Sequence, residues 1–275
     1  MVPEVEIHVG PGRIASIGEA LRAHPDGGTI ILHGESFVES IIVSGSYSMK
    51  PHGDLRPVLT GTEASTIELY GGQLQLEGID VRAPRLPRTP GHAVHLVTAG
   101  RLMAERCSFS SPSAAAVAAG GNQSHLSMRQ CSVQATTKAA IFVYRFARAE
   151  LDYLEISEAG LAGIEVTSMA NVRIERSVVR NCRQDGAVVN GNGTVLKARA
   201  CKFLGNAYAG LAVMDEGLLH AVDCEIADNG QVGVLASGQG RAFLVSGNEI
   251  RGHWRGPWLT VAGGEVRRGE PDVRS

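Results

Sequence analysis

Short runs of alternating apolar and polar residues follow one another along most of the chain. Val172 and Ile174 mark one such run, and Leu211 and Val213 mark another. Alternation places every second side chain on one face of an extended strand. Glycines and other turn residues separate the runs. The pattern therefore predicts many short β-strands joined by tight turns.

The runs recur with a regular period, which several cysteines make visible. The equivalent positions are Cys107, Cys131, Leu154, Ser177, Cys201, Cys224 and Asn248, in steps of 23 or 24 residues. Each step holds three alternating runs, as in "LLHAVDCEIADNGQVGVLASGQG". A unit this short cannot bury its apolar face alone, so stacked copies must share one continuous core.

This repeat resembles a right-handed parallel β-helix of the pectate-lyase-like superfamily and its bacterial β-helix-repeat relatives. The segment "IASIGEALRAHPDGGTIILHGESFVESIIV" resembles the usual family opening, in which a short capping helix leads into a strand and then a segment carrying Gly34, Phe37 and Glu39. The resemblance covers about residues 5 to 265. It implies an all-β fold, a right-handed single-stranded parallel β-helix of ~23-residue coils with a short N-terminal capping helix.

Ile14, Ile17 and Leu21 have helical spacing and are expected to plug the open end of the solenoid. We expect a single domain over residues 1–275. It would consist of an N-terminal strand and capping helix over 1–28, coils over 29–264 and a tail over 265–275.

The cysteines suggest a metal site, a redox system or structural thiols. Metal sites bring several ligands to one point, whereas the four ladder cysteines form a line, in which only Cys107 with Cys131 and Cys201 with Cys224 can be neighbours. Cys182 falls in a different turn. We therefore interpret the cysteines as free thiols packed in the core, with no metal and no cofactor.

Composition agrees with a solenoid and limits the partners. The chain has 34 glycines, 44% hydrophobic residues and only 5% aromatic residues, which indicates tight turns and small core side chains. Its formal net charge of −2 gives no strong field to recruit nucleic acid or an anionic membrane. We find no signal-peptide pattern and no apolar run of ~18 residues, so we expect a cytoplasmic location.

Strands that follow a conspicuous glycine resemble the first sheet of the family, which usually forms the site in its enzymes. Alternation predicts two outward rows on this sheet. One row runs through His95, Ala118, Phe142, Glu165, Val188, Ala212, Leu235 and Trp258, and the other through Val97, Gly120, Tyr144, Thr167, Asn190, Met214, Ser237 and Thr260. Stacked rungs lie ~4.8 Å apart, so neighbours in a row can share one ligand.

Glu165 is the candidate for proton transfer. Phe142 and Val188 on neighbouring rungs would partly desolvate it and raise its pKa toward the useful range. Tyr144, in a polar stack with neighbouring rungs, would orient a substrate oxygen. We predict Glu165 and Tyr144 as catalytic residues. The predicted substrate-binding residues are His95, Phe142, Thr167, Val188, Asn190, Ala212, Met214, Leu235 and Trp258.

The segment 82–92, "RAPRLPRTPGH", interrupts the repeat with three prolines and three arginines. It either folds over one end of the groove as a lid or is a solvated loop.

Three functions remain open. The first is a cytoplasmic, cofactor-independent enzyme that binds a largely apolar small molecule, such as a natural-product intermediate, and catalyses cyclisation, isomerisation or elimination. The second is a non-catalytic binding or scaffold module with a protein partner in a larger bacterial assembly. A polysaccharide lyase or sugar epimerase is third, because the clustered carboxylates common in the superfamily's sugar-processing enzymes are missing.

Overall fold

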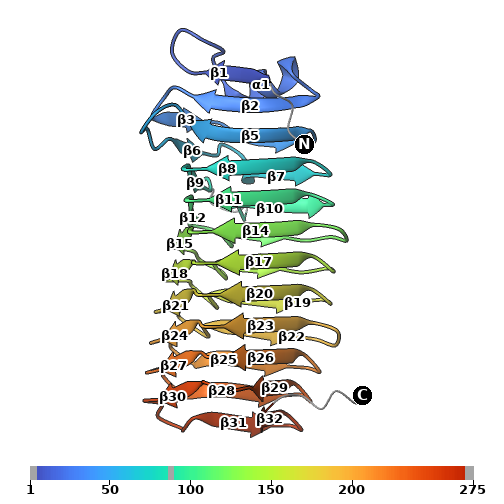
Figure 1. Ribbon diagram of the computed structural model, residues 1–275, viewed down its shortest axis with the longest axis vertical. Helices are drawn as coiled ribbons and strands as arrows, with labels where there is room; N and C mark the ends of the chain where they lie inside the picture. The colour runs from blue at the N-terminus through green and yellow to red at the C-terminus, as the bar shows by residue number, and fades with distance from the viewer. Residues whose placement is uncertain (1–4, 86–89, 270–275) are drawn as a thin grey trace.

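The chain forms a solenoid of stacked parallel strands, as a computed structural model shows for residues 5–85 and 90–269 (Figure 1). Its strands make three sheets, which we name sheet A with 12 strands and sheets B and C with 10 strands each. Each turn of the chain contributes one strand to each sheet, so strand neighbours along the middle of a sheet differ by three in number. The expected all-β coil architecture is confirmed.

Sheet A contains β1 (Glu6–Val9), β2 (Gly27–Leu32), β5 (Ser46–Pro51), β8 (Gln73–Glu77), β11 (Arg101–Glu105), β14 (His125–Arg129), β17 (Arg148–Asp152), β20 (Asn171–Glu175), β23 (Val195–Arg199), β26 (Leu218–Val222), β29 (Arg241–Leu244) and β32 (Glu265–Arg268). Sheet B contains β3 (Ser36–Val38), β6 (Val58–Thr60), β9 (Asp80–Arg82), β12 (Ser108–Ser110), β15 (Ser132–Gln134), β18 (Glu155–Ser157), β21 (Val178–Arg180), β24 (Lys202–Leu204), β27 (Glu225–Ala227) and β30 (Glu249–Arg251). Sheet C contains β4 (Ile41–Val43), β7 (Ser65–Tyr70), β10 (His92–Thr98), β13 (Val117–Ala119), β16 (Ile141–Val143), β19 (Ile164–Thr167), β22 (Ala187–Asn190), β25 (Ala209–Met214), β28 (Val232–Ser237) and β31 (Trp258–Val261).

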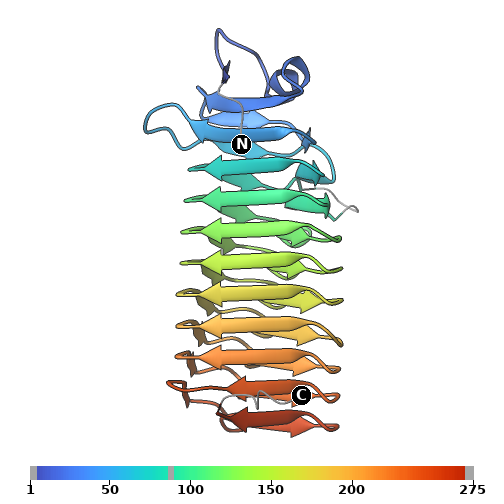
Figure 2. The same ribbon diagram turned by 45° about the vertical axis from the view of Figure 1, so that its right-hand side comes forward.

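Columns of identical register build the core. One column of fully buried side chains comprises Ile67, Val94, Val117, Ile141, Ile164, Ala187, Leu211 and Val234. The strands of successive turns lie one above another along the long axis (Figure 2). Apolar side chains of each turn are therefore covered by those of the next, which removes their surface from water.

The capping helix α1 (Ile17–Ala23) closes the N-terminal end, and its side chains play the expected plugging role. Ile17 is fully buried and Leu21 packs against the core. Ser16 caps the helix, since its hydroxyl accepts from the backbone N–H of Glu19 at 3.1 Å. The carboxylate of Glu39 accepts from two further helical N–H groups, of Ile17 and Gly18, each at 2.8 Å. This contact explains why a glutamate follows the third strand of the family-like opening.

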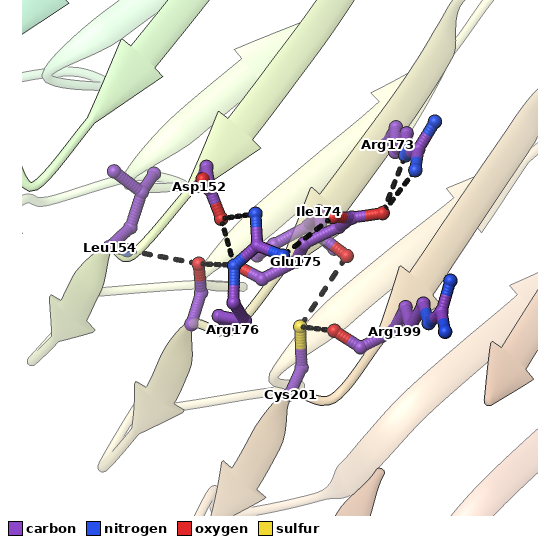
Figure 3. A network of polar contacts seen from close by, with 9 residues as sticks. Asp152, Leu154, Arg173, Ile174, Glu175, Arg176, Arg199 and Cys201 are labelled. Atoms are coloured by element: carbon purple, nitrogen blue, oxygen red, sulfur yellow. Dashed lines mark hydrogen bonds and ion pairs between the residues drawn. The ribbon is translucent and has the colours of Figure 1, made fainter. Parts of the chain in front are cut away.

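The bend between sheets A and B contains the cysteine ladder. The residue before each of six ladder positions has φ between 46° and 53°; these are Arg106, Gln130, Tyr153, Arg176, Ala200 and Asp223. All five cysteines of the chain are free and buried. In Figure 3 the thiol of Cys201 lies 3.5 Å from the carbonyl oxygen of Ile174 and 3.2 Å from that of Arg199. The thiol thus fills the bend and contacts backbone oxygens there, as the structural interpretation predicts.

Ion pairs link the turns on the outer side of this bend. The guanidinium of Arg176 lies 2.7 Å from a carboxylate oxygen of Asp152 and 3.3 Å from one of Glu175 (Figure 3). Both ends of these pairs are partly solvated, so each contributes little to stability by itself.

A second ladder, not foreseen from the sequence, lies in the bend between sheets B and C. The side-chain oxygen of Asn229 accepts from the backbone N–H of Asn206 at 3.0 Å and from its amide nitrogen at 2.9 Å. Asn229 in turn donates to the carbonyl of Phe203 at 3.0 Å. Cys182 and His253 occupy the equivalent position in the flanking turns. These bonds satisfy buried polar groups at a bend that the sheets cannot pair.

The coil extends beyond its expected C-terminal boundary. Residues 265–268 were expected in a tail, but they form β32, because Glu265 and Val266 pair with β29 and Val266 packs on the core.

The segment 82–92 was expected to be either a lid or a solvated loop, and its residues 86–89 lie outside the described residues. Among the described residues, no helix has the length and apolar character needed to cross a membrane.

Replacing Cys201 with serine or alanine should lower stability more than function. The thiol is buried, so its loss leaves a small void or an extra polar hydroxyl, at about 1 kcal/mol. Urea unfolding measures this, and an activity or binding loss at unchanged stability would contradict the structural role.

Asn229→Ala should lower the free energy of unfolding by about 3 kcal/mol, because it leaves several buried donors and acceptors unpaired. Asn192→Ala, at an exposed turn position, is the matched control and should change stability little. Equal urea midpoints for the two variants would show that the asparagine ladder does not stabilise the solenoid.

Candidate functional site

The predicted row on sheet C is confirmed from His95 to Leu235. Register pairs link its members, which are His95, Ala118, Phe142, Glu165, Val188, Ala212 and Leu235. Trp258 was wrongly placed at the end of this row. It pairs with Val234 of an interior column, while Leu259 pairs with Leu235, because the last step takes 24 residues. Trp258 therefore continues an interior column at the last turn, where its side chain is exposed.

The hydroxyl of Tyr144 makes the central contact of the site. It lies 3.0 Å from Nε2 of His95, although the two residues are 49 positions apart. Tyr144 follows β16 and His95 is on β10, so the side chain crosses β13 to reach its partner. A Cβ added at Gly120 would overlap the Tyr144 ring. The missing side chain at Gly120 thus provides the space in which this ring lies.

An aromatic surface surrounds this contact. The rings of Phe142 and Tyr144 stack with centres 4.7 Å apart and an angle of 8° between their planes. Ala118 faces outward by register but is only 1% exposed, so neighbouring side chains cover it. The guanidinium carbon of Arg145 lies 5.7 Å from the centre of the Tyr144 ring. A flat aromatic patch therefore lies beside a polar pair and an exposed cation.

Three further residues, which the sequence interpretation missed, complete what we call the polar cluster: Glu68, Tyr70, His92, His95 and Tyr144. Glu68 pairs in register with His95. The hydroxyl of Tyr70 donates to Glu68 at 3.1 Å. The ring centre of His92 lies 5.0 Å from that of His95, and its Nδ1 lies 2.9 Å from the carbonyl oxygen of Ala115. Alternation in "STIELY" marks Glu68 and Tyr70 as outward, and this signal could have found them.

Burial controls protonation in the polar cluster. Desolvation lowers the pKa of His95 to about 4, with a smaller lowering from His92 and an opposing effect of Glu68. Burial likewise lowers the pKa of His92. The hydrogen bond to Glu68 raises the pKa of the Tyr70 phenol. At neutral pH His95 is therefore an uncharged imidazole that can exchange a proton with the Tyr144 hydroxyl.

Glu165 and Tyr144, the two predicted catalytic residues, do not come together. Glu165 lies on β19, three strands from His95, whereas the Tyr144 hydroxyl is held toward β10 on the opposite side. Burial raises the pKa of Glu165, and the nearby charge of Lys138 opposes this shift. Thr167 pairs with Asn190 as the alternation predicted. The catalytic assignment of Glu165 stays a prediction.

Beyond Glu165, part of the outer face of sheet C is an apolar patch. Ala209, Ala212 and Val232 form a buried cluster outside the core, with Val188, Met214, Leu235 and Leu259 packed against them. Four of the predicted binding residues are thus brought together here, namely Val188, Ala212, Met214 and Leu235. Sheet C presents a polar end and an apolar end, with Glu165 between them.

Open grooves border sheet C. One of about 450 Å³ lies between α1 and sheet C and includes Arg22 and Glu68 among its lining residues. It approaches the polar cluster but does not include Phe142, Glu165 or Val188. Within residues 5–85 and 90–269, no three His, Cys, Asp or Glu side chains are arranged to hold a metal ion.

Comparison with known families decides the relationship of the chain. The pattern described as "Right handed beta helix region" matches residues 67–219 and 115–268. The chain belongs to this right-handed β-helix family. The family match also confirms the expected handedness of the coil. A comparison with curated proteins finds no match.

Solved structures of similar shape include carbohydrate-processing enzymes. The chain is similar to the periplasmic alginate epimerase AlgG, with 12% identity, a TM-score of 0.52 and coverage of 88% of this chain and 76% of that one. It is similar to pectate lyase Pel9A, with 11% identity, a TM-score of 0.52 and coverage of 99% and 80%. It is also similar to ORF18 of Geobacillus virus E2, with 9% identity, a TM-score of 0.54 and coverage of 90% and 52%. At these identities the likeness concerns the fold.

His95 should make the protein less stable in acid. Because its pKa is lowered in the folded state, the unfolded chain binds a proton first as pH falls from about 6.5 toward 4. Its contribution is fully present above about pH 6.5 and is lost through this window. Urea midpoints at pH 7.5 and pH 4.5 should therefore differ less for His95→Asn than for the natural protein. An equal difference in both proteins would mean that His95 is not desolvated.

Proposed function

We propose that the protein is a carbohydrate-active enzyme of the lyase or epimerase type, which transfers protons at a carbon next to the carboxylate of a sugar acid. The hydrogen bond between His95 and Tyr144 carries this proposal. Two enzymes with this architecture, an alginate epimerase and a pectate lyase, process such sugars, and they add support. This was the third of the functions that the sequence left open.

The pair has the properties that general acid–base catalysis requires. A neutral imidazole accepts a proton at neutral pH, and a phenol donates one. The contact at 3.0 Å holds both groups at hydrogen-bond distance before a substrate arrives. Their partial burial strengthens electrostatic interactions with a bound substrate.

The surroundings fit a sugar ring. The stacked rings of Phe142 and Tyr144 offer a flat apolar surface to the C–H face of a pyranose. The guanidinium of Arg145 is placed to pair with the sugar carboxylate, which would acidify the neighbouring C–H bond. Glu68 lies in register with His95 and can accept a hydrogen bond from a hydroxyl group.

The proposed step starts when His95 takes the proton from the carbon next to the carboxylate. In an elimination, the electron pair forms a C=C bond, the glycosidic C–O bond breaks, and Tyr144 protonates the leaving oxygen. In an epimerisation, the same carbon is reprotonated from its opposite face, so the hydrogen bond between Tyr144 and His95 must open and the sugar ring must lie between the two groups. Both reactions need an acid and a base near one carbon, which is what the pair supplies.

A second candidate is a binding module without catalysis. The apolar patch favours it. Val188, Met214, Leu235 and Leu259 are only partly buried there, and apolar side chains that stay partly exposed together often mark binding sites for apolar molecules or proteins. In that case Glu165, at the border of the patch, would contribute specificity. The first function that the sequence left open, an enzyme for an apolar small molecule, requires Glu165 for turnover. Loss of turnover in Glu165→Gln would therefore distinguish that enzyme from the sugar-acid enzyme and from the binding module.

The proposal predicts strong losses on removing either member of the pair. Polygalacturonate, alginate and glucuronan are incubated with the protein in D₂O, and NMR reports unsaturated ends or deuterium at the acidic carbon. Tyr144→Phe and His95→Gln should each reduce the rate by about 100-fold or more. Gly120→Ala should do the same while keeping the fold, because its methyl group displaces the Tyr144 ring.

Tyr208→Phe is the control, since Tyr208 is an exposed tyrosine just before β25, away from the pair. It should leave the rate unchanged. Absence of exchange and elimination with every sugar acid, or full rates in Tyr144→Phe, would refute the proposed function.

A further inference from the structure

A second groove, of about 760 Å³, runs along sheet A on the far side of the turn that follows Tyr144. We call it the sheet A groove. Three basic side chains form its floor: Arg101 on β11, His125 on β14 and Arg148 on β17. They are in register on neighbouring strands. With strands ~4.8 Å apart, the two arginines lie roughly 10 Å from each other along the solenoid axis.

The two arginines have no acidic partner. No Asp or Glu lines the sheet A groove, and within residues 5–85 and 90–269 neither Arg101 nor Arg148 forms an ion pair. Glu150 lies two positions along β17 from Arg148, yet the two side chains are not paired. Elsewhere on the same sheet, Arg106 and Arg173 do pair with glutamates.

The two arginines have guanidinium groups available to pair with an anion. A bound ligand with two acidic groups would form charge-assisted hydrogen bonds to both of them. Arg101 and Arg148 are both exposed, so their guanidinium groups are free to meet a ligand. An anionic chain that follows the axis would meet a guanidinium group on β11 and another on β17, with the imidazole of His125 on β14 between them.

The remaining lining narrows the chemistry of this anion. Gln73 and Asn171 end the column, so amide groups flank the cations on both sides. Phe146 and Met169 stand at the rim and are 55% and 53% exposed. Amides donate and accept hydrogen bonds as sugar hydroxyls require, and an exposed aromatic ring stacks on the apolar face of a sugar.

We propose that the sheet A groove is a binding site for a linear anionic polysaccharide, bound parallel to the solenoid axis with acidic groups on Arg101 and Arg148. A nucleic acid fits less well. It would need a wide basic field to replace its counterions, whereas this groove offers three basic side chains on a chain of net charge −2.

This site does not depend on the proposed function. The His95–Tyr144 pair is on sheet C, and the turns that join sheet C to sheet A, including the one through Phe146, lie between it and the sheet A groove. A binding module without catalysis could use the sheet A groove equally well. An enzyme could use it to hold a long substrate while sheet C acts on another part.

Calorimetry with oligogalacturonate and oligomannuronate tests the site, with neutral dextran oligosaccharide as the uncharged probe. The natural protein should bind at least one acidic probe and not dextran, and its affinity should fall as salt rises. Arg101→Gln with Arg148→Gln should weaken binding by at least about tenfold. Its thermal midpoint at low salt should stay close to that of the natural protein, because neither arginine forms an ion pair that the substitution would break.

Arg199→Gln is the matched control, an exposed arginine farther along sheet A on β23. It should bind as the natural protein does. Tyr144→Phe should also retain binding, even if it abolishes turnover, and this separates the site from the proposed function. The inference is overturned if no acidic probe binds, if the double variant binds unchanged, if dextran binds equally, or if single-stranded DNA binds more tightly at the same salt.

Discussion

In-register stacking of turns is the constraint on which the rest of the structure depends. Each residue lies above its equivalent in the previous turn, so residues of similar size and polarity repeat in columns through the molecule. Columns of valine, isoleucine and leucine make the core. Columns of cysteine and asparagine close the bends by satisfying backbone groups that no sheet pairs. Stability is therefore spread over many small and nearly equal contributions between neighbouring turns.

The candidate site arises where this regularity is interrupted. Outward positions of a solenoid sheet normally meet only the neighbours directly above and below. At Gly120 the absent side chain lets the Tyr144 ring cross a strand and reach His95, two strands away. A single small residue thus joins two polar groups that strict stacking would keep apart. The same crossing lays an aromatic surface over the sheet and helps to shield the imidazole from water.

Much of this could be predicted from the sequence, because the period of 23 or 24 residues acts as a ruler. This period predicted the three sheets, the structural role of the thiols and the row from His95 to Leu235. It failed where the period changes. Glu68 and His95 are 27 positions apart because of the long segment between their strands, so Glu68 and Tyr70 were missed.

Other features depend on side-chain torsions, which a repeat pattern does not contain. The sequence placed Tyr144 correctly on the outer face but beside Thr167 and Asn190. Its hydroxyl instead points toward His95, because Gly120 leaves space for the ring and the hydrogen bond to His95 stabilises this orientation. The asparagine ladder was missed for a related reason. Asn206 and Asn229 share the period with Cys182 and His253, so three different residue types occupy four equivalent positions and conceal the ladder.

The polar cluster and the apolar patch on sheet C are separated by a whole number of turns of the solenoid. Removing or duplicating one complete turn between β16 and β22 would shift the two surfaces by a single strand spacing and leave the interior columns continuous. A fold of this kind can change the length of the ligand it spans without redesigning either end. Loss of one residue within a strand would instead turn a buried column outward. The number of turns can therefore change more readily than the length of a strand within a turn.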